Sequence, residues 1–272
     1  MNVIMFIQSV VLGIVQGITE WLPISSTGHL LLINQFLNLD VSEKFMNMFK
    51  VVIQFGSILA VIVLYFNKLN PFSPKKTAEQ KKSTWTLWFK VIVAVIPAAV
   101  AGFLLENIID TALSTPYVIA AALIIYGVLF IVIENKNKKP NVTDLNSLTY
   151  KRALAIGAFQ MLALIPGTSR SGSTILGAVM LGTSRECASE FSFFLAIPVM
   201  FGASLLKMLG FGFNLSSAEW QILITGTLVS FLVSLAAIKF LMGYVKKHDF
   251  KAFGYYRIVL GVLVLIYFGL IK

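Results

Sequence analysis

Residues 17–32 read GITEWLPISSTGHLLL. Between Glu20 and His29 this stretch holds two serines, a threonine and Pro23, with apolar residues on either side. A helix that faces lipid rarely carries this many polar groups, because each needs a partner that the hydrocarbon core does not supply. The stretch therefore predicts a helix interrupted by a polar loop, buried inside the protein.

The rest of the chain is strongly apolar. Of its 272 residues, 57% are hydrophobic and 12% are charged, and the mean hydropathy is +0.84, whereas a soluble domain carries about 25% charged residues. Uncharged runs such as 51–66, 112–133 and 220–238 approach the roughly 20 residues that a helix needs to cross a bilayer. This composition predicts an all-α integral membrane protein and argues against a soluble helical one.

The net charge of +10 does not indicate a nucleic-acid partner, because the lysines stand mostly in short loops between apolar runs. We expect these loops to face anionic lipid at a bilayer, and we expect no nucleic acid to bind.

Cys187 is the only cysteine, which rules out an internal disulfide and a cysteine metal cluster. The N-terminal residues lack a basic region and a cleavage site, so we expect them to be retained.

The apolar runs predict six transmembrane helices and two re-entrant helix–loop–helix hairpins. The hairpins cover 1–37 and 153–183, where a proline and hydroxyl residues divide an apolar stretch into halves too short to span a membrane alone. The six spans are predicted at 49–66, 88–106, 115–133, 190–209, 220–243 and 254–271.

The basic residues predict the orientation. Loops 67–90, 134–152 and 244–253 are rich in lysine and arginine, whereas 107–114 and 210–219 contain neither. Positively charged loops stay in the cytoplasm. If the second hairpin returns to its own side, all three basic loops can be cytoplasmic together, and both termini lie outside.

This topology makes the chain an inverted repeat within one membrane domain, 1–272. Repeat 1 covers about 1–133, repeat 2 covers about 153–272, and a cytoplasmic linker, 134–152, joins them. The sequence LPISSTGH (22–29) echoes IPGTSRSG (165–172), and GSILAVIV (56–63) echoes FFLAIPVM (193–200). Inverted repeats with broken helices place a functional site near the membrane midplane.

Three ionisable residues stand apart from the loops and span ends that hold the other charges. They are Glu20 and His29 in the first hairpin and Arg170 in the second, whereas Arg257 lies near a span end. A charge at the bilayer centre costs about 2.5–3.5 kcal/mol, so a function or a pairing must compensate it. A purely structural ion pair between Glu20 and Arg170 is one explanation, and helix capping by the loop hydroxyls is a second.

The stretch PGTSRSGST (166–174) favours phosphate chemistry. A loop of small and hydroxyl residues before a helix presents N–H donors and the positive end of a helix dipole, and an arginine adds a bidentate fork. The first hairpin offers a carboxylate, hydroxyls and an imidazole as base and nucleophile candidates. A phosphoryl-transfer enzyme is the leading hypothesis. A transporter or flippase for an anionic lipid or solute is the alternative, because it uses the same broken-helix ends.

Two motifs resemble those of a known family, the integral-membrane undecaprenyl-diphosphate phosphatases or bacitracin-resistance proteins. They are QGITE (16–20) running into LPISSTGH (22–29), and PGTSRSG (166–172). VIQFGSILAV (52–61) is similar to the family's next span, and the resemblance covers essentially the whole chain. It implies a homodimer in the bacterial plasma membrane with an exterior-facing site. It also implies metal-dependent hydrolysis of undecaprenyl diphosphate, which recycles the lipid carrier of cell-wall synthesis and confers bacitracin resistance.

The resemblance also implies roles for single residues. Glu20 corresponds to the family's acid, as metal ligand or general base, Ser26 to a nucleophile, His29 to an acid/base or alternative nucleophile, and Arg170 to a phosphate clamp. Whether Ser26, His29 or an activated water attacks phosphorus stays open. The residues expected to contact substrate are Ser25, Thr27, Gly167, Thr168, Ser169, Ser171, Gly172 and Thr174.

Gln16 departs from the two-carboxylate form of the family's acidic motif. Four residues before Glu20, it shares a helix face with it. Its amide oxygen can bind Mg²⁺ or Ca²⁺ but cannot act as a base, so any mechanism that needs two carboxylates here is in doubt. We expect a divalent ion held by Glu20, with Gln16 as a second ligand. Gln160 in the second hairpin is interpreted as a polar brace or, as the plain structural alternative, as a residue that forms hydrogen bonds between helices.

Overall fold

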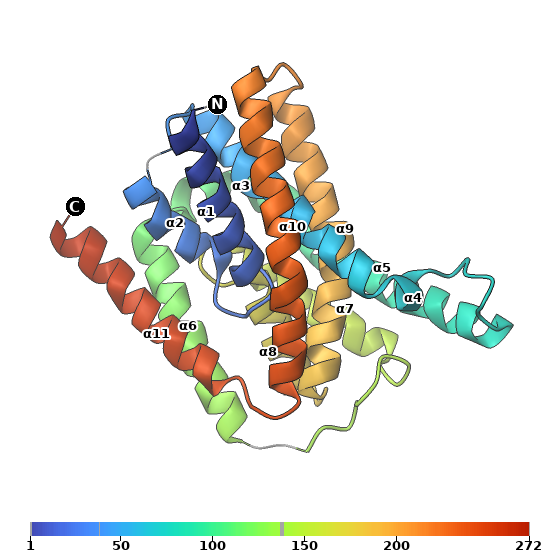
Figure 1. Ribbon diagram of the computed structural model, residues 1–272. Coiled ribbons are helices and arrows are strands. Elements are labelled where there is room, and N and C mark those ends of the chain that lie inside the picture. The colour runs from blue at the N-terminus through green and yellow to red at the C-terminus, as the bar shows by residue number, and fades with distance from the viewer. Residues whose placement is uncertain (1, 38, 137–138, 272) are drawn as a thin grey trace.

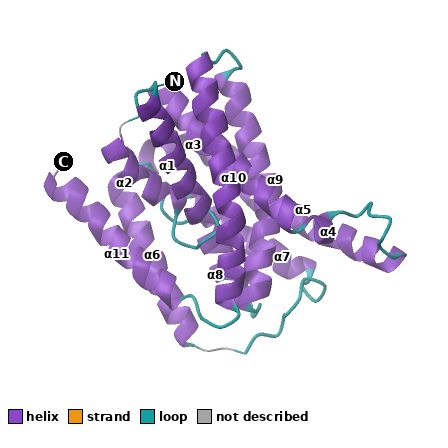
Figure 2. Cartoon of the chain, viewed as in Figure 1, coloured by secondary structure: helices purple, strands orange, loops and turns teal. Residues whose placement is uncertain are grey.

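The computed structural model describes residues 2–37, 39–136 and 139–271, and this part of the chain folds into helices without a β-strand (Figures 1 and 2). The α-helices are α1 (Val3–Thr19), α2 (Ser26–Leu37), α3 (Glu43–Leu64), α4 (Phe66–Leu69), α5 (Ala78–Ile108), α6 (Pro116–Asn135), α7 (Tyr150–Met161), α8 (Arg170–Met180), α9 (Arg185–Phe211), α10 (Ser217–Val245) and α11 (Lys251–Ile266). A 3-10 turn, Leu162–Leu164, follows α7, and π-helical turns follow α5 and α11 at Ile109–Leu113 and Tyr267–Ile271.

Six of these helices are long and apolar enough to cross a membrane. They correspond one to one to the six predicted spans, with boundaries that shift by a few residues except at the start of α5. They are Glu43–Leu64, Ala78–Leu105, Pro116–Asn135, Arg185–Phe211, Ser217–Val245 and Lys251–Leu270. The six-span prediction is therefore confirmed.

Helix α5 begins ten residues earlier than the predicted span. Residues 78–90 are therefore helical, and their prediction as the second half of loop 67–90 is wrong. The sequence TAEQ (77–80) explains the early start. The backbone N–H of Gln80 donates to Thr77 Oγ1 at 3.2 Å and that of Thr77 donates to Gln80 Oε1 at 3.0 Å, which is a capping box. Lys90 lies inside the helix, buried, with its ammonium donating to the carbonyl oxygens of Leu145 and Asn146.

The two segments predicted as hairpins each consist of two short helices and a loop. α1 and α2 have 17 and 12 residues, and α7 and α8 have 12 and 11. In each loop the residue before the second helix is a serine with a φ of 73°, Ser25 or Ser169. The backbone therefore aligns Ser25 with Ser169. The similarity of LPISSTGH (22–29) to IPGTSRSG (165–172) aligns Ser26 with Ser169 instead. The difference arises because the second loop has one more residue between its proline and its positive-φ serine than the first loop has.

The helices pack in matching pairs. α1 lies against α10, α7 lies against α5, and α6 and α11 run side by side (Figure 1). The closest approach of the last pair is between two glycines. A Cβ on Gly127 would lie 2.7 Å from the carbonyl oxygen of Gly254, and a Cβ on Gly254 would lie 2.7 Å from that of Gly127. Neither position has room for a side chain.

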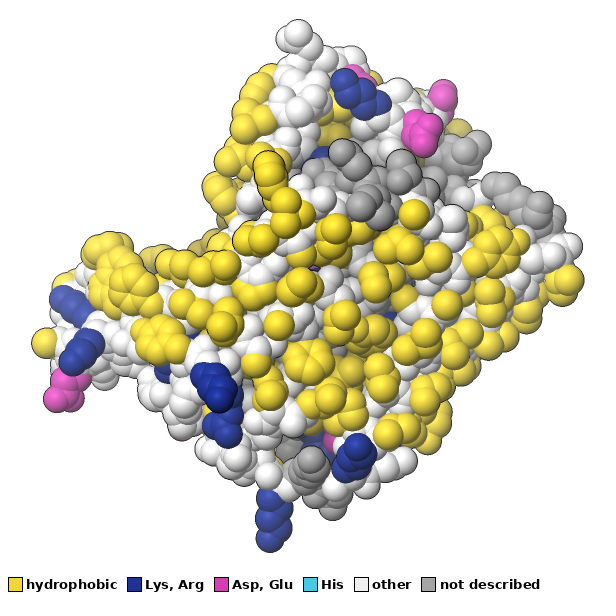
Figure 3. All heavy atoms as spheres, turned by 180° about the vertical axis from the view of Figure 1, so that it is seen from behind, with side chains coloured by type: hydrophobic (Ala, Val, Ile, Leu, Met, Phe, Trp, Pro, Cys, Tyr) yellow, Lys and Arg dark blue, Asp and Glu magenta, His cyan; other side chains and the backbone are white. Residues whose placement is uncertain are grey.

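The surface has an apolar band. Seen from behind, hydrophobic side chains cover the middle of the molecule, and most lysines and arginines lie below it or at the projecting end that carries α4 and the start of α5 (Figure 3). Exposed hydrophobic side chains on the apolar helices include Phe103, Ile125, Leu206 and Val259. A monomer in water does not expose so large a patch, whereas lipid covers it.

We predict that Gly254→Ala weakens the α6–α11 contact. The added methyl group meets backbone atoms that cannot move aside, and overpacking of this kind costs about 1–3 kcal/mol. Thermal unfolding in detergent should show a lower midpoint. Gly243→Ala is the matched control, because a Cβ there meets no described atom within 4 Å apart from its own helix, and alanine favours a helix over glycine. Equal midpoints for the two variants would contradict this account of the contact.

Candidate active site

The carboxylate of Glu20 is the centre of a buried polar cluster. Glu20 follows the last residue of α1 and is 6% exposed. Its Oε1 accepts from Arg170 Nη2 at 3.0 Å, and its Oε2 accepts from Gln16 Nε2 at 2.9 Å and from Ser26 Oγ at 3.1 Å. The donors come from α8, α1 and α2, so one carboxylate joins the two helix–loop–helix segments.

The guanidinium of Arg170 is held on several sides. Besides Glu20, its Nη1 donates to the carbonyl oxygen of Ser192 at 2.8 Å, and the group lies 5.4 Å from the ring centroid of Trp21. Thr174 supports it through a 2.7 Å hydrogen bond to the hydroxyl of Ser192. The remaining donor, Nε, is buried and has no partner in the described part of the chain. One N–H of a fixed guanidinium is therefore available to an anion.

The second loop also fastens the first. The hydroxyl of Ser171 donates to the carbonyl oxygens of Glu20 at 3.0 Å and Leu22 at 3.3 Å. Trp21, between these two residues, is fully buried and packs edge-on against Phe193 of α9 with ring centroids 5.2 Å apart. The loop that carries Glu20 is therefore anchored both to α8 and to the main apolar core.

Arg257 is a member of the site that the sequence did not reveal. It was placed near a span end, but it lies inside α11 and is 0% exposed. Its guanidinium donates to carbonyl oxygens of both loops, at 3.1 Å to Pro23, 3.0 Å to Gly167 and 2.9 Å to Thr168. It also reaches the carbonyl oxygens of Ala122 and Leu123 at 3.4 Å. The sequence feature that could have revealed this role is an arginine with apolar residues on both sides.

His29 lies one turn into α2 and is 8% exposed. Its Nδ1 is 2.7 Å from the carbonyl oxygen of Ser25, and its Nε2 is 2.6 Å from the hydroxyl of Tyr256 on α11. Both ring nitrogens are therefore occupied by groups other than Glu20 and Ser26. The structure brings Glu20, Ser26 and Arg170 into direct contact but keeps His29 beside this cluster.

The hydroxyls of Ser25 and Ser169 cap helices, as one explanation of the sequence proposed. Ser25 Oγ accepts from the N–H of Gly28 at 3.4 Å and Ser169 Oγ from that of Gly172 at 3.1 Å. Both α2 and α8 thus begin at the polar cluster, where their N-terminal ends contribute positive potential.

The remaining predicted residues differ in their surroundings. Gly167 has a φ of 91°, and a Cβ there would lie 2.5 Å from the carbonyl oxygen of Ile119. Thr168 is buried with a hydroxyl that has no partner in the described chain, whereas Thr27 is exposed. Gln160 is buried, and neither atom of its amide finds a partner among the described residues. The expectation that Gln160 braces two helices by hydrogen bonds is therefore wrong.

Comparison with known proteins identifies the family of this chain. A family model described as "Bacitracin resistance protein BacA" matches residues 9–263. The chain belongs to the BacA family. It is 60% identical over 264 residues to "Undecaprenyl-diphosphatase 1" of Clostridioides difficile (strain 630), covering 97% of this chain and 96% of that protein. The resemblance stated from the two motifs is therefore confirmed, and the six apolar helices are those of a multi-pass membrane protein.

Two further relatives have the same relationship to this BacA-family chain. It is 59% identical to "Undecaprenyl-diphosphatase" of Acetivibrio thermocellus, over 96% of this chain and 97% of that protein. It is 57% identical to "Undecaprenyl-diphosphatase" of Enterococcus faecalis (strain V583), over 96% of each chain. The likeness extends over nearly the full length in every case, so it includes both loops of the polar cluster.

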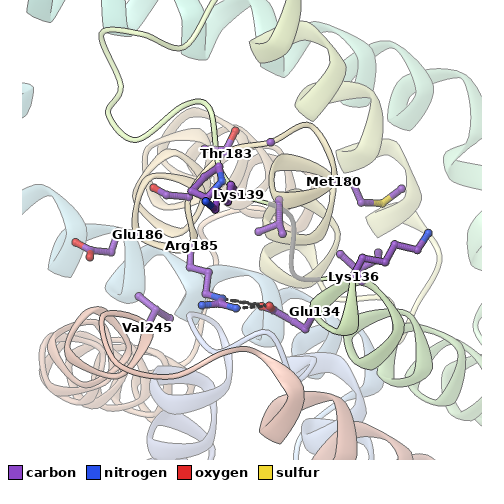
Figure 4. Close-up of a pocket in the computed structure, with 13 residues that line it drawn as sticks. Glu134, Lys136, Lys139, Met180, Thr183, Arg185, Glu186 and Val245 are labelled. Carbon is purple, nitrogen blue, oxygen red and sulfur yellow. Dashed lines mark hydrogen bonds and ion pairs between the residues drawn. The ribbon is translucent and has the colours of Figure 1, made fainter.

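A cavity of about 470 Å³ lies elsewhere, between the end of α6 and the start of α9 (Figure 4). The ion pair of Glu134 and Arg185 lies at its wall, with Arg185 Nε 3.0 Å from Glu134 Oε1. The same carboxylate accepts from the backbone N–H of Phe250 at 3.1 Å. The pair joins α6, α9 and the start of α11. The residues that line this cavity include no member of the polar cluster around Glu20.

We predict that Arg257→Met destabilises the fold. The variant leaves buried carbonyl oxygens of both loops without donors, and each such loss costs roughly 1–3 kcal/mol. The free energy of unfolding in detergent should fall by about 3 kcal/mol or more. Arg152→Met is the control, because Arg152 makes its hydrogen bond to Asn141 at an exposed position. A loss no larger than that of the control would show that Arg257 does not hold the loops together.

Proposed function

We propose that this chain hydrolyses undecaprenyl diphosphate to undecaprenyl phosphate and inorganic phosphate. The reaction recycles the lipid carrier for cell-wall polymer synthesis, and it confers bacitracin resistance. The observation that carries the proposal is the contact of Glu20 with both Ser26 and Arg170, in a chain of the BacA family. Relatives at 57–60% identity that are named undecaprenyl-diphosphatases support the substrate.

The geometry favours Ser26 as the attacking group. Its hydroxyl already donates to Glu20 Oε2 at 3.1 Å, which is the nucleophile–base contact of covalent catalysis. In the proposed step, Ser26 Oγ bonds to the terminal phosphorus while its proton passes to Glu20. The bond from that phosphorus to the bridging oxygen breaks, and undecaprenyl phosphate leaves with the proton that Glu20 held, so Glu20 is a carboxylate again. Water then attacks the phosphoserine while Glu20 accepts a proton from it. The bond between phosphorus and Ser26 Oγ breaks, the proton returns from Glu20 to Oγ, and inorganic phosphate is released.

Arg170 is the proposed phosphate clamp. Its Nε–H has no acceptor among the described residues, while Nη1 and Nη2 are held by Ser192 and Glu20. The guanidinium is therefore oriented before substrate arrives, which reduces the reorganisation needed to stabilise the developing charge. The hydroxyl of Thr168 and the N-terminal ends of α2 and α8 supply further donors and positive potential for a diphosphate.

The residues present fit a divalent cation. No group of three His, Cys, Asp or Glu side chains gathers among the described residues, but Mg²⁺ often takes one or two carboxylates and completes its shell with substrate phosphate and water. Gln16 Oε1 is buried and has no hydrogen-bond partner in the described part of the chain, and the same amide contacts the carboxylate of Glu20 through its Nε2. We propose that Glu20 and Gln16 hold Mg²⁺ or Ca²⁺. A bound ion would offset phosphoryl charge.

We also propose that both helix–loop–helix segments are re-entrant hairpins of an inverted repeat. Four pairs of residues support this, each separated by the same interval of 144 positions in the sequence. The pairs are Gly13 with Gly157, Gln16 with Gln160, Ser25 with Ser169, and Gly28 with Gly172. The reciprocal contact of Gly127 and Gly254, and the packing of α1 on α10 and of α7 on α5, support the same two-fold relation.

The proposed location is the bacterial plasma membrane, with the active site and both termini on the exterior side. The loops before α7 and before α11 are rich in lysine, and they lie at the end of the molecule away from both termini (Figure 1). One membrane domain, 1–272, divided into repeats at about 133 and 153, follows from the same arrangement. A homodimer is proposed from the family resemblance.

We predict that purified protein releases phosphate from a polyprenyl diphosphate only when a divalent metal is present. Ser26→Ala and Arg170→Ala should each lower kcat/KM by about 10³-fold, because nucleophile and phosphate clamp are lost. His248→Ala is the control, since His248 is exposed beside Tyr244. A folded, metal-loaded wild type that released no phosphate would overturn the enzyme assignment, and a fully active Ser26→Ala would leave His29 or an activated water as the attacker.

We predict that Gln16→Glu retains activity. The variant replaces an amide oxygen by a second carboxylate at the proposed metal site, and divalent cations bind carboxylates more tightly. The metal concentration that gives half-maximal phosphate release should fall, while kcat stays within about threefold of wild type. An inactive but folded Gln16→Glu would show that the amide N–H donated to Glu20 is what the site requires.

A further inference from the structure

The contact between His29 and Tyr256 determines which nitrogen of the imidazole carries a proton. The carbonyl oxygen of Ser25, 2.7 Å from Nδ1, can only accept. Nδ1 must therefore be protonated, and in neutral His29 the lone pair is on Nε2. That nitrogen is 2.6 Å from the hydroxyl of Tyr256, so the phenol donates to it.

Tyr256 also restrains the orientation of the ring. The two rings are nearly parallel, 5° apart, with centroids separated by 5.5 Å. His29 is only 8% exposed, whereas Tyr256 is 46% exposed, so the phenol ties a buried imidazole to a group at the edge of the molecule. The next residue, Arg257, holds both loops through their carbonyl oxygens. One turn of α11 therefore positions the loops and the imidazole together.

We propose that Tyr256 is a positioning residue for the diphosphatase reaction, holding His29 with Nε2 unprotonated and directed to the phenol. This inference rests on the proposed function. The hydroxyl suits both charge states of the ring, because it donates to neutral Nε2 and accepts from the protonated form. His29 can then gain or lose a proton during turnover without rotating out of place.

The first test is a double-mutant cycle on phosphate release. Tyr256→Phe removes only the hydroxyl and keeps the ring, and it should lower kcat about tenfold, a part of what general acid–base catalysis contributes, with KM changed less than about twofold. In a His29→Gln background the same change should have no further effect. Tyr255→Phe is the matched control, because Tyr255 is 58% exposed on the same helix. If Tyr256 had only a packing role, Tyr256→Phe would lower activity equally in the wild-type and His29→Gln backgrounds.

The second test does not depend on activity. His29 and His248 are the only histidines, so His248→Gln leaves one imidazole for ¹⁵N NMR. We expect one protonated and one unprotonated ring nitrogen at neutral pH. Tyr256→Phe should move the unprotonated resonance, and Tyr255→Phe should leave it in place.

The two tests separate the possible failures. A wild type without phosphatase activity would overturn the proposed function, while the NMR comparison would still decide the Tyr256–His29 contact. An unmoved resonance overturns the contact itself. A shifted resonance together with a Tyr256→Phe kcat within twofold of wild type overturns the role in catalysis.

Discussion

The ion pair between Glu20 and Arg170 is the interaction on which the rest of the site depends. Neither charge is tolerated alone in an apolar interior, because the desolvation cost is repaid only by a partner with good geometry. The pair is 3.0 Å long, and the two residues are 150 positions apart in the sequence. Two loops from opposite halves of the chain must therefore meet, and the hydroxyl of Ser171 and the guanidinium of Arg257 hold them there.

The charges around this pair do not balance. Arg257 binds carbonyl oxygens, not a carboxylate, so Glu20, Arg170 and Arg257 together leave one positive charge inside the protein. Two helix N-termini, and the Arg170 Nε–H that has no acceptor among the residues the structure describes, add to that potential. Such a centre is stabilised by an anion, and a diphosphate supplies one. The same imbalance disfavours a purely structural role for the ion pair.

The sequence predicted the fold well where a local pattern was sufficient. Apolar run length located the six spans, and the proline–hydroxyl stretches located both broken helices. The start of α5 was missed because a capping box at 77–80 outweighed the lysines that follow it. The alignment of the two loops was one residue out, since only the backbone shows that Ser25 and Ser169 share a positive φ.

The sequence by itself determined the class of protein, its spans and its family, because these depend on composition and short motifs. Only the tertiary structure decided which groups touch. The hydroxyl of Ser26 forms a hydrogen bond with the carboxylate of Glu20, and the imidazole of His29 forms one with the hydroxyl of Tyr256. The tertiary structure also showed that Arg257, seven residues into a helix, lies under both loops. Contacts between residues more than a hundred positions apart depend on how whole helices pack, and no local pattern encodes them.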